Sequence, residues 1–271
     1  MLPAAEPAEL SLSPAARKRQ SEYYRDLIWT LLVKEFKARY KSTVLGYAWS
    51  VLHPLLFTLV YLFLFKVVLK VQVENYTLFL MAGVFPWQAF QNSVSSGSLV
   101  FIANSSLIKR VRFPRELMVL AGVLNDLSHF VLSLPIIGAM MIWYGIMPQW
   151  DCLWAFPVML VAQLLFTFGL TLVTATCNLF LRDLERLIGI IVMLWFYLTP
   201  VLFKEDWVPE RLQWTSYANP MAAIVITWRH IFMGTPVGLD HLVAGCGWAV
   251  VAFAAGFLLF RRLNWRFAEL V

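Results

Sequence analysis

The sequence has little charge for its length. Only 14 per cent of the 271 residues are Asp, Glu, Lys or Arg, while 60 per cent are hydrophobic, and the mean hydropathy is +0.69. These values lie far outside the usual range of soluble proteins. The composition therefore excludes an ordinary soluble domain and predicts an integral membrane protein.

Cysteine and the signatures of several enzyme classes are also scarce. The three cysteines are scattered without metal-binding spacing, so we expect packing residues and no metal site. Glycines do not precede the single Lys-Ser pair, Lys41 and Ser42, so the chain is not expected to bind ATP through a phosphate loop. Paired carboxylates and a nucleophile-base pair are missing, which argues against a glycan-modifying enzyme. No segment has the character of a nucleic-acid-binding module.

The amino-terminal segment lacks the features of a secretory signal. Its first 16 residues contain no basic region followed by an apolar core, so we expect no cleavable signal peptide. Residues 1–20 are instead predicted to form a disordered cytoplasmic tail.

Long uncharged runs dominate the rest of the chain. About 17 residues is the lower limit for crossing a bilayer, and seven runs reach it: 42–65, 75–108, 127–150, 152–181, 187–203, 212–228 and 241–260. The alternation typical of a membrane strand is absent, and lipid-exposed backbone must satisfy its hydrogen bonds internally. The predicted fold class is therefore an all-α integral membrane protein.

One of the seven runs is a poor span. Residues 212–228 contain Asn219 and Pro220 at their middle. Leaving this run out predicts six transmembrane helices within the domain 42–271. Their expected bounds are 44–66, 77–103, 117–144, 153–180, 187–203 and 239–260.

Lysine and arginine orient these six spans. Seventeen of the 22 fall on one side: eight before the first span, four in 109–115, two in the loop after the fourth span and three near the carboxyl end. Five fall on the other side. Because cytoplasmic loops carry the excess of positive charge, both termini are predicted to be cytoplasmic. Membrane lipids, rather than nucleic acid, are the expected partners of the excess charge.

Two further segments are predicted to lie at the membrane without spanning it. Residues 21–41 form an amphipathic interfacial helix. Its apolar positions are Tyr24, Leu27, Ile28 and Leu31, and its polar positions are Asp26, Thr30, Lys34, Lys37 and Lys41. Residues 204–239, partly apolar but broken by prolines, are predicted to form a re-entrant helical hairpin between spans five and six. An ordinary surface loop is the alternative.

Two sets of residues are candidates for a transport pathway. The aromatic residues near the ends of spans one and five offer flat amphipathic surfaces to a passing sugar chain. They are Tyr47, Trp49, Tyr61, Trp195, Phe196 and Tyr197. Asp126 and His129, three apart on one helical face, offer a proton relay for an ion-coupled secondary transporter. Against the relay, Asp126 is expected near the cytoplasmic interface, where its charge is hydrated.

Two short charged loops on the cytoplasmic side provide a plausible docking face. The first, LIKRVRFPRE, holds Lys109, Arg110, Arg112, Phe113, Pro114, Arg115 and Glu116. The second, LRDLERL, holds Arg182, Asp183, Glu185 and Arg186. A simpler alternative exists for each loop. Anchoring of the helices would by itself explain the first, and a solvated turn with local charge pairs, which contribute little energy, would explain the second.

Four motifs in order resemble the permease subunit of ABC-2 type polysaccharide exporters, which export O-antigen, capsule or teichoic acid chains. They are KEFKARYKSTVLGYAWSVLHPLL (34–56), LIKRVRFPRE (107–116), NLFLRDLERLIGIIVMLWFYLTPVLF (178–203) and YANPMAAI (217–224). The resemblance covers about residues 24–266. It departs from the commonest family pattern in having YANP where LNP is frequent.

The resemblance implies a bacterial inner-membrane channel subunit that moves lipid-linked polysaccharide and is not itself an enzyme. Two such permeases form a homodimer with two copies of a cytoplasmic ABC ATPase, which binds ATP and Mg²⁺; no cofactor is expected on this chain. Residues 109, 110 and 112–116 then fall in the ATPase-coupling region, and Arg182, Asp183 and Glu185 in a second coupling loop. Spans one and five of such permeases line a continuous channel with aromatic residues. An ABC-2 exporter of a small lipid or drug is the nearest alternative.

Overall fold

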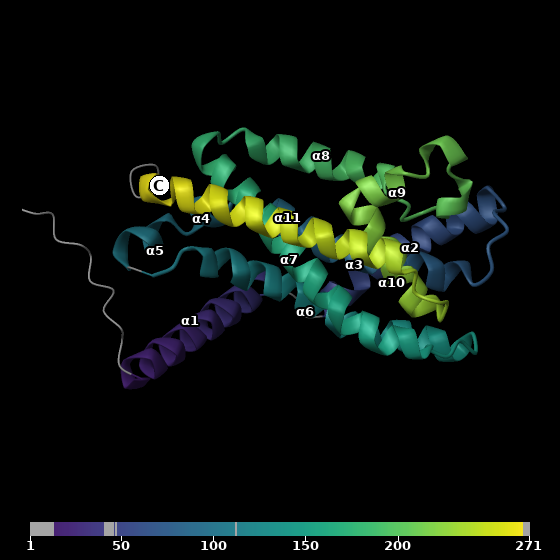
Figure 1. Cartoon of the computed structure of the whole chain (residues 1–271), viewed down its shortest axis with the longest axis horizontal. Helices are drawn as coiled ribbons and strands as arrows, with labels where there is room; N and C mark the ends of the chain where they lie inside the picture. Colours follow the sequence, from purple (N-terminus) through teal and green to yellow (C-terminus); the bar gives the residue numbers. More distant parts are fainter. Residues whose placement is uncertain (1–13, 41–45, 47, 112, 268–271) are drawn as a thin grey trace, which may run out of the picture.

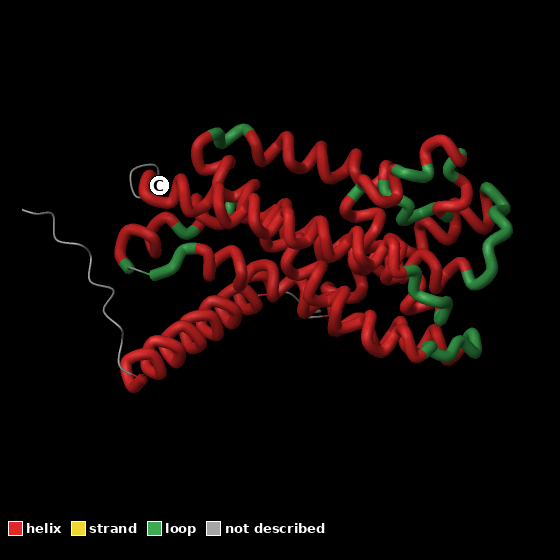
Figure 2. The backbone as a smooth tube through the Cα atoms, viewed as in Figure 1, coloured by secondary structure: helices red, strands yellow, loops and turns green. Residues whose placement is uncertain are grey.

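Helices are the only regular secondary structure in the part of the chain that the computed structural model describes, residues 14–40, 46, 48–111 and 113–267. The α-helices are α1 (Pro14–Tyr40), α2 (Ala48–Leu62), α3 (Tyr76–Gly97), α4 (Val100–Ala103), α5 (Ser105–Arg110), α6 (Glu116–Trp143), α7 (Trp150–Phe180), α8 (Leu184–Leu198), α9 (Thr215–Ala218), α10 (Pro220–Met233) and α11 (Leu239–Leu263). A π-helix, η1 (Phe63–Val68), extends α2, and the 3-10 helices are η2 (Glu205–Trp207), η3 (Glu210–Leu212) and η4 (Asn264–Arg266). Figure 2 shows that loops only connect these helices. The predicted all-α fold class is confirmed.

Four helical segments of the described chain are long and apolar enough to cross a membrane: Ala48–Val68, Glu116–Trp143, Trp150–Phe180 and Leu239–Arg266. Two of the six predicted spans are less regular than expected. α3 is a 22-residue helix that ends at Gly97, and α4 covers the remainder of the predicted span to residue 103. α8 ends at Leu198 rather than at residue 203 because Thr199, which precedes Pro200, adopts an extended conformation.

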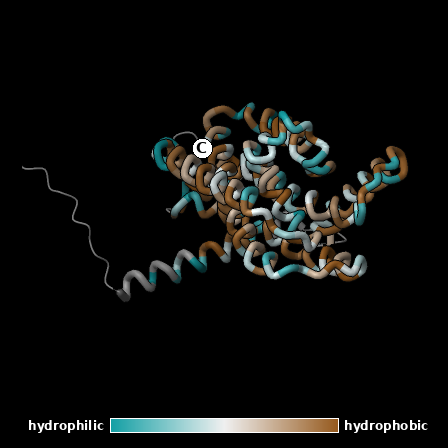
Figure 3. The backbone as a smooth tube through the Cα atoms, turned by 45° about the vertical axis from the view of Figure 1, so that its right-hand side comes forward, coloured by the Kyte–Doolittle hydropathy of each residue, from teal (hydrophilic) through white to brown (hydrophobic). Residues whose placement is uncertain are grey.

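The core of the bundle is formed around α3 and α10. Most residues of both helices are buried, and α10 is in contact with α3, α6, α7 and α11. α7 and α11 run side by side and approach closely at two glycines, since a Cβ atom on Gly256 would lie 2.1 Å from the Gly169 carbonyl oxygen. Hydrophobic residues dominate the long helices of the bundle other than α1, and many hydrophilic ones lie in the connecting segments (Figure 3).

The bundle has two ends (Figure 1). The α5 end holds α4, α5, the connection between α7 and α8, and the end of α11. The α9 end holds α9 and the connections between α2 and α3, between α6 and α7, and between α10 and α11. The two predicted coupling loops therefore lie at the same end of the molecule.

The amino-terminal helix α1 is longer than predicted. It begins at Pro14, so residues 14–20, expected in the disordered tail, are helical, and residues 1–13 lie outside the described part. Leu31 is buried, and Leu27 packs beside it against a hydrophobic cluster that includes α6 residues. Lys34 and Lys37 are exposed, whereas Lys41 and the Tyr24 side chain are outside the described residues. One face of α1 is thus packed, and its interfacial position stays a prediction.

The segment 204–239 is not an ordinary surface loop. Its first part, with η2, η3 and α9, is short and irregular, but every residue from Met221 to Arg229 is buried in α10. α10 begins at Pro220 behind Asn219, whose side-chain oxygen accepts hydrogen bonds from the Met221 and Ala222 amides. This is the usual chemistry of a helix N-cap. Its entry into a membrane stays a prediction.

Candidate coupling surface and channel wall

The basic loop at the α5 end divides into an exposed part and an anchored part. Lys109 and Arg110 close α5 and are exposed. Arg115 turns inward: its Nη1 donates to the backbone oxygen of Asn264 at 2.8 Å and to its Oδ1 at 3.0 Å. Burial lowers the pKa of the Arg115 guanidinium, which lies 5.7 Å from the centre of the Phe267 ring. Arg115 thus joins the loop to the end of α11.

The other predicted residues of this loop have mixed environments. Phe113 and Pro114 are half-buried, and so is Glu116, which begins α6. Arg112 lies outside the described residues.

The second charged loop is exposed but firmly positioned. Arg182, Asp183 and Glu185 are all exposed. Asn178, buried near the end of α7, donates from Nδ2 to the Ser98 carbonyl at 3.0 Å and accepts the Glu185 amide through Oδ1 at 3.0 Å. No sequence pattern singled out Asn178, although it opens the motif that contains this loop.

An aromatic cluster connects the α5 end to α11. The ring centres of Phe101 on α4, Phe260 on α11 and Phe267 beyond η4 lie 4.9 to 6.0 Å apart, and all three side chains are buried. The Lys34 ammonium of α1 hydrogen bonds to Asn104, between α4 and α5. Packed and hydrogen-bonded contacts thus join α1, α4 and the end of α11 at this end of the molecule.

Three of the six predicted channel residues gather around one cavity. Tyr61, Phe196 and Tyr197 line a hollow of about 300 Å³ between α2, α3 and α8. The Tyr61 and Phe196 rings are 5.7 Å apart, and those of Phe196 and Tyr197 are 5.3 Å apart. We call this hollow the aromatic cavity.

The other three channel candidates lie elsewhere. Trp49 is exposed at the start of α2, away from the cavity lining. Trp195 packs within the bundle, with ring centres 5.4 Å from Phe90, and donates its Nε1 proton to Asn219 Oδ1 at 2.8 Å. Tyr47 lies outside the described residues.

Polar residues of α3 and α2 complete the aromatic cavity, and the sequence analysis did not identify them. His53 Nδ1 lies 2.9 Å from Gln88 Oε1, and Trp87 Nε1 donates to Gln91 Oε1 at 2.9 Å. Asn92 lines the same cavity. The available signal was the group of amides inside the uncharged run 75–108.

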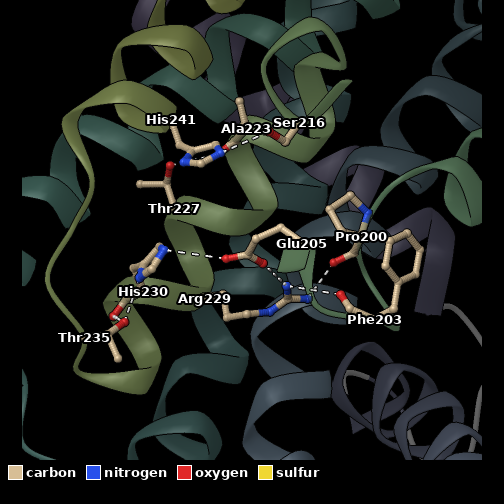
Figure 4. A network of polar contacts seen from close by, with 10 residues as sticks. All are labelled: Pro200, Phe203, Glu205, Ser216, Ala223, Thr227, Arg229, His230, Thr235 and His241. Carbon is tan, nitrogen blue, oxygen red and sulfur yellow. Dashed lines mark hydrogen bonds and ion pairs between the residues drawn. The ribbon is translucent and has the colours of Figure 1, made fainter. Parts of the chain in front are cut away.

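A buried arginine organises the α9 end (Figure 4). Arg229 is 6 per cent exposed, and its Nη2 donates to the carbonyl oxygens of Pro200 at 2.6 Å and Val201 at 3.1 Å. Its Nη1 lies 3.5 Å from Glu205 Oε2, and its guanidinium carbon lies 3.7 Å from the centre of the Phe79 ring. Arg229 therefore fastens α10 to α3 and to the segment after α8.

The acidic residue of the proposed proton relay is not hydrated. Asp126 is 1 per cent exposed and accepts a hydrogen bond from Ser93 Oγ at 3.1 Å, and His129 is 7 per cent exposed. The expectation that Asp126 meets water near the membrane surface is wrong, because α3 covers that face of α6.

Comparison with known proteins decides between the transporter classes. Residues 26–233 match the family described as ABC-2 type transporter. The chain belongs to the ABC-2 type transporter family. It is thus a multi-pass membrane permease rather than an enzyme, and the ion-coupled alternative built on Asp126 and His129 is not retained.

Relatives within the ABC-2 family cover nearly the whole chain. An "O-antigen export system permease protein RfbA" of Klebsiella pneumoniae is 40 per cent identical over 92 per cent of this chain and 96 per cent of its own length. A second protein of that name from the same species is 39 per cent identical over the same shares. One from Myxococcus xanthus is 33 per cent identical over 93 per cent of this chain and 97 per cent of its own.

Proposed function

We propose that this chain is the permease subunit of an ATP-driven exporter that moves lipid-linked polysaccharide of the O-antigen type across the bacterial inner membrane. The observation that carries the proposal is similarity to O-antigen export permeases over 92 per cent of the chain. That similarity also favours polysaccharide over the small lipid or drug of the alternative exporter.

The proposed assembly is a homodimer with two copies of a cytoplasmic ATPase. ATP and Mg²⁺ bind to the ATPase, and this chain holds no cofactor. Each permease has six spans with α3 and α8 as the second and fifth, and both termini in the cytoplasm. The concentration of lysine and arginine at the α5 end supports this orientation. The α9 end then faces outward, α1 lies along the cytoplasmic surface, and α10 belongs to a re-entrant hairpin.

The α5 end is the proposed contact with the ATPase. Lys109 and Arg110 on one loop and Arg182, Asp183 and Glu185 on the other are exposed and charged. Charges of both signs suit a docking surface that must align a partner. Arg115 has another part in this proposal: its hydrogen bonds to Asn264 and its position over Phe267 carry movement of the loop to α11.

The α2 and α8 side of the bundle is the proposed wall of the channel. Exposed apolar side chains cover this side: Leu56, Leu59 and Val60 on α2, Phe63 on η1, and Ile190, Ile191, Leu194 and Leu198 on α8. The aromatic cavity opens between these two helices. A second copy facing this side would enclose a path lined by Tyr61, Phe196, Tyr197 and the amides of α3. Such a lining combines flat apolar rings with hydrogen-bonding groups, as a sugar chain requires.

Recruitment of an ATPase tests the proposal. The full-length permease, purified from its own host, should bring down the ABC ATPase encoded beside its gene. The Lys109→Glu/Arg110→Glu double variant should lose most of that ATPase while remaining folded, since substitutions at exposed sites usually change stability by about 0.5 kcal/mol or less. Arg211→Glu, an exposed charge reversal at the α9 end, is the matched control. A wild-type permease that recruits no ATPase would contradict the proposal.

A further inference from the structure

A second cavity, of about 270 Å³, lies at the α9 end of the bundle. It is bounded by the end of α8, the segment that contains η2, α9 and the start of α11. Its polar wall consists of Glu205, Asp206, Gln213, Thr215, Ser216, Tyr217 and His241. Its volume is just below the range of about 300 to 1,000 Å³ typical of small-ligand pockets. The cavity therefore suits a ligand of one ring rather than a long chain.

The cavity lies next to the proposed channel wall. Leu198 lines it, while the preceding residues Phe196 and Tyr197 line the aromatic cavity. The hydrogen bond from Trp195 Nε1 to Asn219 Oδ1 holds this end of α8 against the start of α10. A chain that moves outward along α8 would reach this second cavity after the aromatic one.

The cavity presents a flat aromatic surface with polar groups beside it. The Tyr217 and His241 rings are stacked with centres 4.4 Å apart and an angle of 14° between their planes. Tyr217 is 41 per cent exposed, so its ring is accessible to a ligand. His241 Nε2 lies 3.4 Å from Ser216 Oγ, which fixes the orientation of the imidazole (Figure 4). Aromatic rings next to hydroxyl, amide and carboxylate groups can bind the apolar face of a sugar and its hydroxyl groups together.

The charges around the cavity oppose an anionic ligand. Asp206 is exposed and acidic, whereas the Arg229 guanidinium points away toward the Pro200 and Val201 carbonyl oxygens. Glu205 is already in contact with Arg229, and its Oε1 lies 4.0 Å from His230 Nε2. A phosphate or uronate would thus meet a carboxylate without an accessible guanidinium, while hydroxyl groups would meet acceptors.

We propose that this cavity is an exit-side binding site for one neutral sugar residue, held by stacking on Tyr217 and by hydrogen bonds to Asp206, Gln213 and Ser216. The identity of its natural ligand, a residue of the exported polysaccharide, rests on the proposed function. The binding chemistry itself depends only on the cavity. Occupation of this site would retain the chain at the outer end between successive steps of export.

Binding of simple glycosides to the isolated permease tests the site. The full-length protein in lipid nanodiscs, free of glycoside detergents, is titrated with the methyl glycosides of glucose, galactose and mannose, and saturation-transfer NMR reports contact and Kd. Binding of at least one glycoside is expected. Tyr217→Ala should weaken it about three- to tenfold, the range expected for loss of one aromatic stacking contact. Tyr217→Phe should retain it, because the ring remains.

Two comparisons make the test specific. Trp214→Ala removes an exposed aromatic residue of the same segment that does not line the cavity, and it should bind like the wild type. Methyl glucuronide should bind more weakly than methyl glucoside, and Asp206→Asn should reduce that difference. Three results would each overturn the site. They are absence of glycoside binding, equal losses of affinity in Trp214→Ala and Tyr217→Ala, and binding of an organic diamine but of no glycoside. Normal export in cells lacking the gene would instead overturn the proposed function, and glycoside binding would be unaffected.

Discussion

Replacing Asn219 by alanine should loosen the junction between α8 and α10. The Asn219 side chain accepts hydrogen bonds from the amides of Met221 and Ala222 at 3.1 and 3.4 Å and from Trp195 Nε1 at 2.8 Å. Its own Nδ2 donates to Thr199 Oγ1 at 3.0 Å. One side chain therefore caps α10 and holds the end of α8, where the proposed channel wall meets the α9 end.

The cost follows from these contacts. Loss of an N-cap side chain costs about 1 kcal/mol, and a buried donor left without its acceptor costs roughly 1 to 3 kcal/mol. The Trp195 indole is only partly buried, so we expect a total of about 2 to 3 kcal/mol. For a chain of this size each kcal/mol lowers Tm by roughly 2 to 4 °C. The expected fall in Tm for Asn219→Ala is thus about 4 to 12 °C.

Thermal unfolding followed by circular dichroism, with wild type and variant in the same detergent, measures this change. Asn219→Asp is the matched control, because it keeps the acceptor oxygens of the cap and adds a negative charge at the start of a helix, which is favourable. It loses only the Nδ2 donor, so its Tm should fall less than half as far. A Tm for Asn219→Ala within 2 °C of wild type would refute the reasoning.

Three further predictions concern other parts of the molecule. Arg229→Met should lower stability by about 1 to 3 kcal/mol, because the buried Pro200 and Val201 carbonyl oxygens lose their donor and the partly exposed Glu205 loses its cation. Adding Glu205→Gln should recover part of that loss in the same unfolding assay, and no recovery would show that the ion pair is unimportant. Gly256→Ala should abolish folded protein on size-exclusion chromatography, since its Cβ would lie 2.1 Å from the Gly169 oxygen. Gly247→Ala, whose Cβ would have no neighbour within 4 Å, should be tolerated. Equal yields of the two variants would contradict the close approach of α7 and α11. Tyr197→Ala should leave Tm nearly unchanged, because this side chain is 59 per cent exposed. The same variant should slow polymer export in cells, and a normal export rate would exclude Tyr197 from the proposed channel wall.

The helical class and the four long apolar helices could be predicted from sequence because long uncharged runs permit only one backbone solution in lipid. The predicted positions of the helix ends were less accurate, since hydropathy does not depend on local backbone conformation. The run 187–203 is uncharged throughout, yet α8 stops at Leu198 before the Thr199–Pro200 step. α3 was harder still, because most of its residues are buried among other helices while its amides Gln88, Gln91 and Asn92 line the aromatic cavity, and hydropathy reports neither environment.

Side-chain direction was the part of the site that sequence could not provide. Trp195, Phe196 and Tyr197 are consecutive aromatic residues, and only the packing of α8 shows that the first faces the bundle and the others the aromatic cavity. Arg229 was counted among the cations of an outer segment, but it is buried because carbonyl oxygens and Glu205 surround it. Arg115 likewise was expected on the coupling surface, and its distant partner Asn264 was not foreseeable from local spacing.

The location of the polysaccharide in cells that lack this gene tests the central claim most directly. Cells are grown with and without the gene, and lipid-linked polymer is quantified separately at the cell surface and in the cytoplasmic leaflet. The account predicts that surface polymer disappears, that lipid-linked polymer accumulates inside, and that the wild-type gene restores the surface fraction. Surface polymer at normal levels without the gene would contradict it.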